Sequence, residues 1–217
     1  RSYRECVENL KRVHLPMRIG VFGGSFNPVH IGHVMLASYL KQFEGFDEVW
    51  LMLSPLNPLK ANSTELIPDV TRLKMLDIAL KGAEGIKVSD IELSMPRPSY
   101  TINTLRYLAK RYPRHTFKLI IGSDNWKIFS QWKDSEAIIR DFGVVVYPRP
   151  GYPVGTIYDD DVEVVKAPMA DVSSSFIRNA IARGKDMNYF LPSGVYDYIK
   201  TFNLYIPKPL SGNAVKP

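Results

Sequence analysis

Cysteine is nearly absent from this sequence. Among the 217 residues only Cys6 carries a thiol, which excludes an internal disulfide and a zinc site built from several cysteines. No apolar run approaches the roughly 20 residues that a membrane-spanning helix needs, and no signal-peptide pattern is visible. We therefore expect a cytoplasmic protein with no membrane partner.

Two common nucleotide-binding loops are missing as well. The chain contains no G-x-x-x-x-G-K-[ST] or G-x-G-x-x-G segment, and no acidic residue closes the apolar run that ends at Leu53-Ser54-Pro55. A P-loop enzyme and an NAD-dependent dehydrogenase are both disfavoured. No compact group of carboxylates accompanies the motifs described below, so we predict no metal site made by protein side chains.

The charge balance is positive. A formal net charge of +6 favours an anionic ligand, either a nucleotide or a nucleic acid. Lysine and arginine are scattered along the chain, and the basic stretches at 4–12 and 106–111 are typical of solvated helix faces. We therefore favour a nucleotide and expect no nucleic-acid partner.

Apolar patterning indicates the fold class. Continuous apolar runs at 49–53, 117–121 and 144–146 are typical of parallel strands covered on both faces. They alternate with helical patterns, which predicts an α/β fold with a doubly wound, mostly parallel Rossmann-like sheet and helices on both faces. The expected strands are 17–22, 48–53, 86–91, 117–121, 143–147 and 162–166. The expected helices lie near 31–43, 68–81, 101–112, 133–140, 174–183 and 194–202.

The length suits a single domain. We place it at 17–205, after an N-terminal extension at 1–16 and before a tail at 206–217. Ligands of such sheets bind outside the carboxyl ends of the strands, and Gly23, Asn57, Gly122 and Arg149 each follow a predicted strand.

The segment GGSFNPVHIGH, after the first predicted strand, carries the strongest signal. Gly23-Gly24 would let the chain reverse and bring backbone N–H groups close to a ligand. The helix that follows would point its free N–H groups at the same place, where anions bind favourably. His30 and His33 lie three apart and would share one helix face, with Gly32 leaving room for a substrate. The arrangement predicts a phosphate site with two imidazoles beside it.

This segment resembles the signature of nucleotidyltransferases that carry an H-x-G-H motif. Over about Met17 to Tyr205 the chain is similar to one branch of them, the bacterial nicotinate mononucleotide adenylyltransferases. The supporting landmarks are Asn57-Pro58-Leu59-Lys60, Pro98-Ser99-Tyr100-Thr101, Ile121-Gly122-Ser123-Asp124, Trp132, Tyr147-Pro148-Arg149-Pro150-Gly151 and Ser173-Ser174-Ser175-Phe176-Ile177-Arg178.

The resemblance implies transfer of AMP from ATP to nicotinate mononucleotide, which gives nicotinate adenine dinucleotide and pyrophosphate. The acceptor phosphate is already ionised, so no protein nucleophile is required. His30 and His33 are then donors to the α-phosphate in the transition state, with protonation states left open. The loop residues implied to help bind ATP are Gly23, Gly24, Ser25 and Phe26.

A second phosphate site is implied at Ser174 and Arg178. Serines before a helical pattern are first of all typical of an N-cap. Arg178, one turn into that helix, can place a guanidinium beside the free N–H groups. The resemblance implies that this pair binds the departing pyrophosphate.

The pyridine ring is expected at Tyr100, Thr101 and Trp132. Backbone N–H groups of Tyr100 and Thr101 would meet the ring carboxylate, although Thr101 could equally be a plain N-cap. Trp132 has polar neighbours and is implied to stack on the ring. Trp126 lies in a more apolar segment and is not chosen.

Other ATP contacts are implied at Gly122, Asp124, Arg149 and Lys60. Asp124 would accept from the ribose hydroxyls, or could be the N-cap of the next helix. The chain has Leu59 where the family commonly has a histidine before the lysine. Mg²⁺ is implied as the companion of ATP, held chiefly by phosphates and water.

Two alternatives stay open at this stage. One is a sister adenylyltransferase that uses nicotinamide mononucleotide or phosphopantetheine. The other is a non-catalytic protein that binds a nucleotide or nucleic acid and would not need both histidines. The sequence leaves the formation of a homo-oligomer open.

Overall fold

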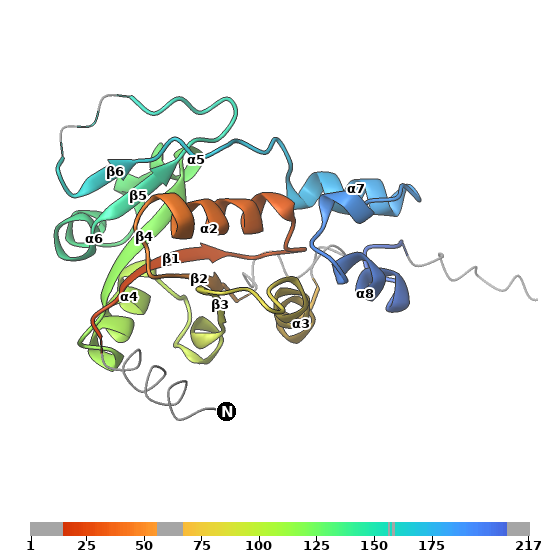
Figure 1. The fold of residues 1–217 in the computed structure, drawn as a ribbon, viewed down its shortest axis with the longest axis horizontal. Coiled ribbons are helices and arrows are strands. Elements are labelled where there is room, and N and C mark those ends of the chain that lie inside the picture. The colour runs from red at the N-terminus through yellow and green to blue at the C-terminus, as the bar shows by residue number, and fades with distance from the viewer. Residues whose placement is uncertain (1–14, 56–66, 156, 158, 208–217) are drawn as a thin grey trace, which may run out of the picture.

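The core of the protein is a six-stranded sheet in which every strand pair is parallel (Figure 1). The computed structural model describes residues 15–55, 67–155, 157 and 159–207. Strand order is β3-β2-β1-β4-β5-β6. The strands are β1 (Arg18–Gly24), β2 (Glu48–Leu53), β3 (Ile86–Ser89), β4 (Thr116–Gly122), β5 (Val144–Tyr147) and β6 (Val162–Val164).

Helices connect the strands and cover the sheet. The α-helices are α2 (Ile31–Phe43), α3 (Asp69–Ala79), α4 (Thr101–Arg111), α5 (Ser123–Trp126), α6 (Ser135–Phe142), α7 (Ser174–Ala182) and α8 (Val195–Thr201). Short 3₁₀ turns lie at η2 (Ile91–Ser94), η3 (Phe129–Gln131) and η4 (Asn188–Phe190). The patterns did not predict α5 or these turns, because each is too short to show a helical period.

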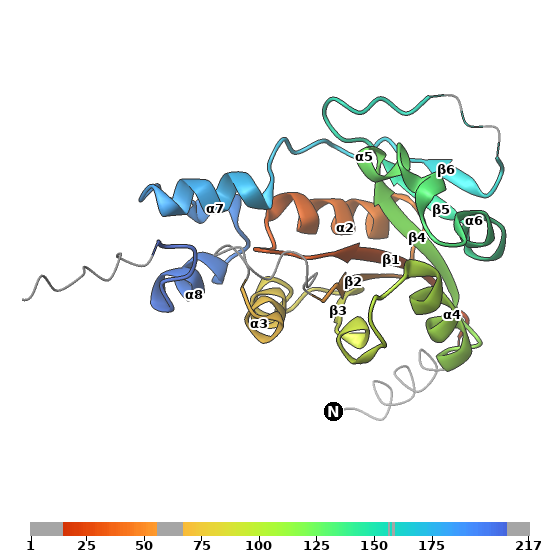
Figure 2. The same cartoon turned by 180° about the vertical axis from the view of Figure 1, so that it is seen from behind.

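Two cores lie on opposite faces of the sheet. Successive side chains of a strand point to opposite faces, so Phe22 of β1 joins one buried cluster while Val21 joins the other. The first cluster takes residues from α2, α3, α7 and α8, and the second from α4 and α6. Both views show α2 on one side of the sheet and α4 on the other (Figures 1 and 2). The predicted doubly wound α/β fold is confirmed.

Strand order reverses between β1 and β4. From β1 the chain winds through β2 to one edge, and β4 then starts the other half beside β1, with Phe22 opposite Ile120. Crossover helices leave on opposite sides at such a point and open a crevice at the carboxyl ends. Helices α7 and α8 lie beyond this end of β1, close to the start of α2 (Figures 1 and 2).

Element ends differ modestly from the sequence predictions. β1 continues through Gly23 and Gly24, which pair with Met52 and Leu53 of β2. β3 ends at Ser89, since the chain turns into η2 two residues later. Among the described residues, no helix is long and apolar enough to cross a membrane.

We expect the Leu51→Ala variant to lose about 2–5 kcal/mol of unfolding free energy. Leu51 is 0% exposed on an interior strand, so truncation leaves a cavity between the sheet and its helices. Urea denaturation followed by circular dichroism measures the loss. Val70→Ala is the control: Val70 is 73% exposed, and its change should stay within ~0.5 kcal/mol. Equal effects of the two variants would contradict the assigned core.

Candidate active site

The loop between β1 and α2 leads into the two histidines of the site, and its Phe26 packs against His33. The prediction that Gly23-Gly24 makes the turn is wrong, because both glycines still belong to β1. The turn comes at Phe26, whose φ of 43° lies in the left-handed region, which is unusual for a residue with a side chain. A Cβ on Gly24 would lie 3.1 Å from the Phe26 ring. Gly24 therefore leaves space for this buried ring.

His30 and His33 cap the N-terminus of α2 reciprocally. His30 is the N-cap residue, and its Nδ1 accepts from the Gly32 N–H at 3.1 Å. Nδ1 of His33 accepts from the His30 N–H, also at 3.1 Å. A Cβ on Gly32 would lie 3.0 Å from the His30 ring. The glycine therefore makes room for the imidazole that caps the helix, and not only for a ligand.

These caps fix the tautomer of both rings. A neutral imidazole has one donor nitrogen and one acceptor nitrogen. Because Nδ1 accepts in both histidines, Nε2 carries the proton in the neutral state. The two rings stack, with centroids 3.7 Å apart and planes at 25°. The edge of Phe26 packs against His33 at 4.9 Å. The site thus holds two Nε2–H donors side by side.

Both histidines are neutral at pH 7. Burial, with a contribution from the Arg149 cation, lowers the pKa of His30 to about 4. Burial also holds the pKa of His33 well below its ordinary 6.5, helped by His30 and Arg149. The groups therefore gain a proton only when the pH falls far below neutrality, and they act at pH 7 as uncharged donors.

A cavity of about 190 Å³ lies against the two imidazoles. Five of the predicted site residues line it: His30, His33, Asp124, Arg149 and Ser174. Six others predicted for catalysis or ATP binding lie outside its lining within the described residues, and these are Gly23, Gly24, Ser25, Phe26, Gly122 and Arg178. Lys60, predicted to attract phosphate, falls outside the described residues.

The N-terminus of helix α7 contributes Ser173 and Ser174 to the lining of the cavity. Ser173, not Ser174, is its N-cap, and its Oγ accepts from the Phe176 N–H at 3.2 Å. Ser174 lines the cavity and donates to the Pro28 carbonyl at 2.9 Å. Arg178 donates to the Asn27 carbonyl, also at 2.9 Å. Both predicted phosphate residues therefore bind the backbone of the β1–α2 loop.

Asp124 and Arg149 face each other at the carboxyl ends of β4 and β5. Their Oδ2 and Nε atoms are 4.0 Å apart, and the buried Oδ1 of Asp124 has no hydrogen-bond partner among the described residues. Gly122 is the N-cap of α5, so the alternative that Asp124 caps this helix is wrong. A Cβ on Gly122 would lie 2.9 Å from Arg149 Cγ, so Gly122 lets these side chains approach.

A second cavity, of about 220 Å³, gathers the predicted pyridine residues. Ser99, Tyr100, Thr101, Trp132 and Lys133 line it. Tyr100 is the N-cap of α4 and Thr101 its first residue, so the alternative that Thr101 is the N-cap is wrong. Nζ of Lys133 lies 4.6 Å from the centre of the Tyr100 ring.

Trp126 and Trp132 differ in their neighbours. Trp126 stacks on Phe129 with planes at 21°, and both tryptophans pack against the second buried cluster. Of the two, Trp132 lines the cavity.

Several residues of the site were missed by sequence reasoning. Tyr147 lines the first cavity, and burial raises the pKa of its hydroxyl to about 12, so it stays protonated. The segment 168–170 also lines this cavity and follows no motif. Lys133 was read only as a polar neighbour of Trp132.

Comparison with known proteins defines the class. Residues 21–180 match the family described as cytidylyltransferase-like, and the chain belongs to this family of nucleotidyltransferases. The parallel sheet, the capped H-x-G-H helix and the cavity at the strand ends agree with that class.

Within that class the chain belongs with the nicotinate-nucleotide adenylyltransferases, a family of enzymes of NAD biosynthesis. A "Probable nicotinate-nucleotide adenylyltransferase" of Bacteroides fragilis is 50% identical over 183 residues, which cover 84% of this chain and 90% of that protein. The relative of the same name from Flavobacterium johnsoniae is 40% identical, over 87% and 99% of the two chains.

A solved structure has the same fold. The Plasmodium falciparum nicotinic acid mononucleotide adenylyltransferase complexed with NaAD superposes with a TM-score of 0.72, at 20% identity, over 87% of this chain and 97% of that one. At this identity the likeness supports the fold alone.

We expect neither His30 nor His33 to titrate between about pH 5.5 and 8 in the folded protein, because burial opposes protonation of both rings. Protonation of His30 should come at pH near 4, where its pKa lies. Nitrogen-15 spectra of labelled histidine should show Nε2–H in both rings at pH 7. A midpoint near 6.5 for either ring, or an Nδ1–H tautomer, would contradict the capping geometry.

Proposed function

We propose that this protein transfers AMP from ATP to nicotinate mononucleotide, releasing nicotinate adenine dinucleotide and pyrophosphate. The observation that carries the proposal is the pair of neutral imidazoles with their Nε2–H groups beside one cavity. Two uncharged N–H donors can stabilise the negative charge that develops on a phosphate during the reaction. They do so by hydrogen bonding and keep their protons.

In the proposed reaction a phosphate oxygen of the mononucleotide forms a bond to the α-phosphorus of ATP. The bond from that phosphorus to the oxygen bridging to the β-phosphate breaks, and pyrophosphate leaves with the electron pair. No proton needs to leave the nucleophile, because the phosphate is already ionised. The role of His30 and His33 is to donate to the α-phosphate oxygens, while the Arg149 cation attracts the phosphates.

The α7 contacts support a role in holding pyrophosphate. Ser174 lines the cavity at the start of α7, where free N–H groups favour an anion. Arg178 holds the Asn27 carbonyl one turn further on, so its charge lies behind the loop. The buried Oδ1 of Asp124, which has no hydrogen-bond partner within the described part of the chain, is suited to accept from the ribose hydroxyls.

The second cavity is proposed to bind the pyridine ring. Thr101 opens α4, whose first N–H groups can bind a ring carboxylate, and Trp132 offers an aromatic face. Lys133 lines the same cavity and adds a positive charge beside Tyr100. A cation attracts the nicotinate carboxylate but gains little from a neutral carboxamide. The acid is therefore the preferred acceptor.

Mg²⁺ is proposed to enter with ATP. Among the described residues, no group of three histidine, cysteine, aspartate or glutamate side chains could hold a metal ion. Of the described residues that line the first cavity, Asp124 alone carries a carboxylate, and Arg149 lies 4.0 Å from it. Phosphate oxygens and water would thus supply most ligands. Cytoplasmic location and the absence of a nucleic-acid partner stay predictions.

The reaction is tested by pyrophosphate release from ATP and Mg²⁺ with each acceptor in turn. We expect turnover with nicotinate mononucleotide and much less with nicotinamide mononucleotide or phosphopantetheine. Release with none of the three would contradict the reaction, and equal release with acid and amide would contradict the specificity.

We expect the His33→Ala variant to lose about a hundredfold or more in kcat, since it removes one transition-state donor. It also removes the acceptor of the His30 N–H. His33→Asn is the matched control, because its Oδ1 can replace Nδ1 in the cap but offers nothing at the Nε2 position. Compared with His33→Ala, His33→Asn should restore the free energy of unfolding but not kcat. If Asn restored both, the role of His33 would be structural only.

We expect the Lys133→Met variant to lose about three- to tenfold of its preference for acid over amide mononucleotide, the size of one partly screened charge interaction. The measurement is the ratio of kcat/KM for the two acceptors at low and at 0.5 M salt. Lys127→Met serves as the control, since exposed Lys127 does not line the cavity. An unchanged ratio in the Lys133 variant would exclude its role in specificity.

A further inference from the structure

Arg72 is an arginine with no solvent exposure, placed on the first turn of α3. A buried charge is costly unless it is paired and fully hydrogen-bonded. Arg72 lines neither of the two cavities. Because burying this charge costs free energy, we expect its hydrogen bonds to serve a role that a smaller apolar residue could not fill.

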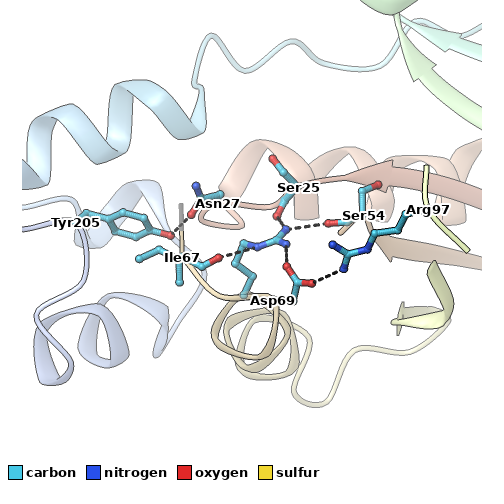
Figure 3. A network of polar contacts seen from close by, with 8 residues as sticks. Ser25, Asn27, Ser54, Ile67, Asp69, Arg97 and Tyr205 are labelled. Atoms are coloured by element: carbon cyan, nitrogen blue, oxygen red, sulfur yellow. Dashed lines mark hydrogen bonds and ion pairs between the residues drawn. The ribbon is translucent and has the colours of Figure 1, made fainter. Parts of the chain in front are cut away.

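The guanidinium joins three segments of the chain, at Ser25, at Ser54 and at 67–69 (Figure 3). It donates to the carbonyls of Ser25, of Ser54 at 3.1 Å and of Ile67 at 3.2 Å. It also pairs with Asp69 at 2.5 Å. Ser25 follows β1 and Ser54 follows β2, so Arg72 ties the carboxyl ends of both strands to the start of α3. Only the planar fork of arginine can donate in so many fixed directions.

The contact with Ser25 fixes the next peptide. In a trans peptide the N–H points opposite to the C=O. With the Ser25 carbonyl directed at Arg72, the Phe26 N–H points the other way, away from α3. The Phe26 ring, 1% exposed, packs edge-on against His33. The Arg72 contact therefore constrains the direction of the Phe26 N–H group, and the ring of the same residue supports His33.

The rest of the loop is held in the same manner. Side chains of α7 bind the carbonyls of Asn27 and Pro28, as described above. The hydroxyl of Tyr205 donates to Asn27 Oδ1 at 2.7 Å (Figure 3). Carbonyl oxygens of the loop thus turn toward the protein. Backbone carbonyls carry partial negative charge, so this arrangement removes it from the side where a phosphate would lie.

We propose that Arg72 is a positioning residue for adenylyl transfer: it holds the Ser25 carbonyl so that the Phe26 N–H faces the phosphates of ATP. The inference rests on the proposed function. It assigns to α3, which lies outside both cavities, the orientation of the β1–α2 loop. It also explains why the loop keeps a left-handed Phe26, since the Arg72 contact offsets the cost of that conformation.

The test compares Arg72→Ala and Arg72→Lys with wild type, using Arg97→Ala as the matched control. Arg97 pairs with the other oxygen of Asp69 at 3.6 Å but is half exposed. We expect both Arg72 variants to raise the KM for ATP about tenfold and to lower kcat about tenfold, as for one lost phosphate donor. The KM for nicotinate mononucleotide should change less than twofold, and Arg97→Ala should resemble wild type.

Two further measurements separate positioning from folding. Low-millimolar guanidinium, added to Arg72→Ala, should restore the KM for ATP by occupying the vacated site. Calorimetry with ATP alone, at a temperature where each variant is folded, should show about tenfold weaker binding by Arg72→Lys. If Arg72→Ala does not fold, the lysine variant decides the matter. A lower melting temperature with unchanged KM for ATP would overturn the proposal.

Failure of the proposed function gives a different result. If wild type released no pyrophosphate with any acceptor, the reaction would be refuted. Calorimetry would still test whether Arg72 contributes to ATP affinity. Wild-type turnover together with unchanged ATP affinity in both Arg72 variants would refute the positioning role alone.

Discussion

The site depends on the need to satisfy backbone donors at the start of α2. Free N–H groups at a helix N-terminus require acceptors, and here the imidazoles of His30 and His33 supply them. Because Nδ1 is used as the acceptor, each ring must carry its proton on Nε2 and must stay neutral to keep its cap. The hydrogen bonds that cap the helix therefore also set the protonation state of the histidines, because protonating either ring would remove a cap.

Hydrogen bonds to the backbone also hold the loop that precedes the helix. Its carbonyls are bound by side chains from α3 and α7, which are separated from it by β2 and by most of the chain. A tight loop with a left-handed Phe26 would be costly if it were free. Contacts from both directions hold it at the switch point of the sheet, where the strand order leaves a crevice.

Several residues at or beside the first cavity have a clear structural role. Two of three consecutive serines have separate roles at α7: Ser173 caps the helix and Ser174 binds the loop, while both line the cavity. Gly122 and Gly24 lack a Cβ because neighbouring side chains occupy the space. At such positions of this chain, a structural interpretation of a motif and a functional one need not exclude each other.

The sequence by itself determined the order of strands and helices, the parallel sheet and the segment with the two histidines. These properties are local: apolar period and turn residues are visible within a few positions. Of the residues that line the two cavities, it indicated His30, His33, Asp124, Arg149, Ser174, Tyr100, Thr101 and Trp132, but not Phe22, Leu36, Tyr147, Lys133 or 168–170. Only the tertiary structure decided which serine caps α7, which nitrogen of each histidine carries the proton, and that Arg72 reaches Ser25. The Arg72–Ser25 contact joins residues 47 positions apart. The caps of α2 and α7 are local, but which side-chain atom turns to the backbone is not visible in the residue pattern.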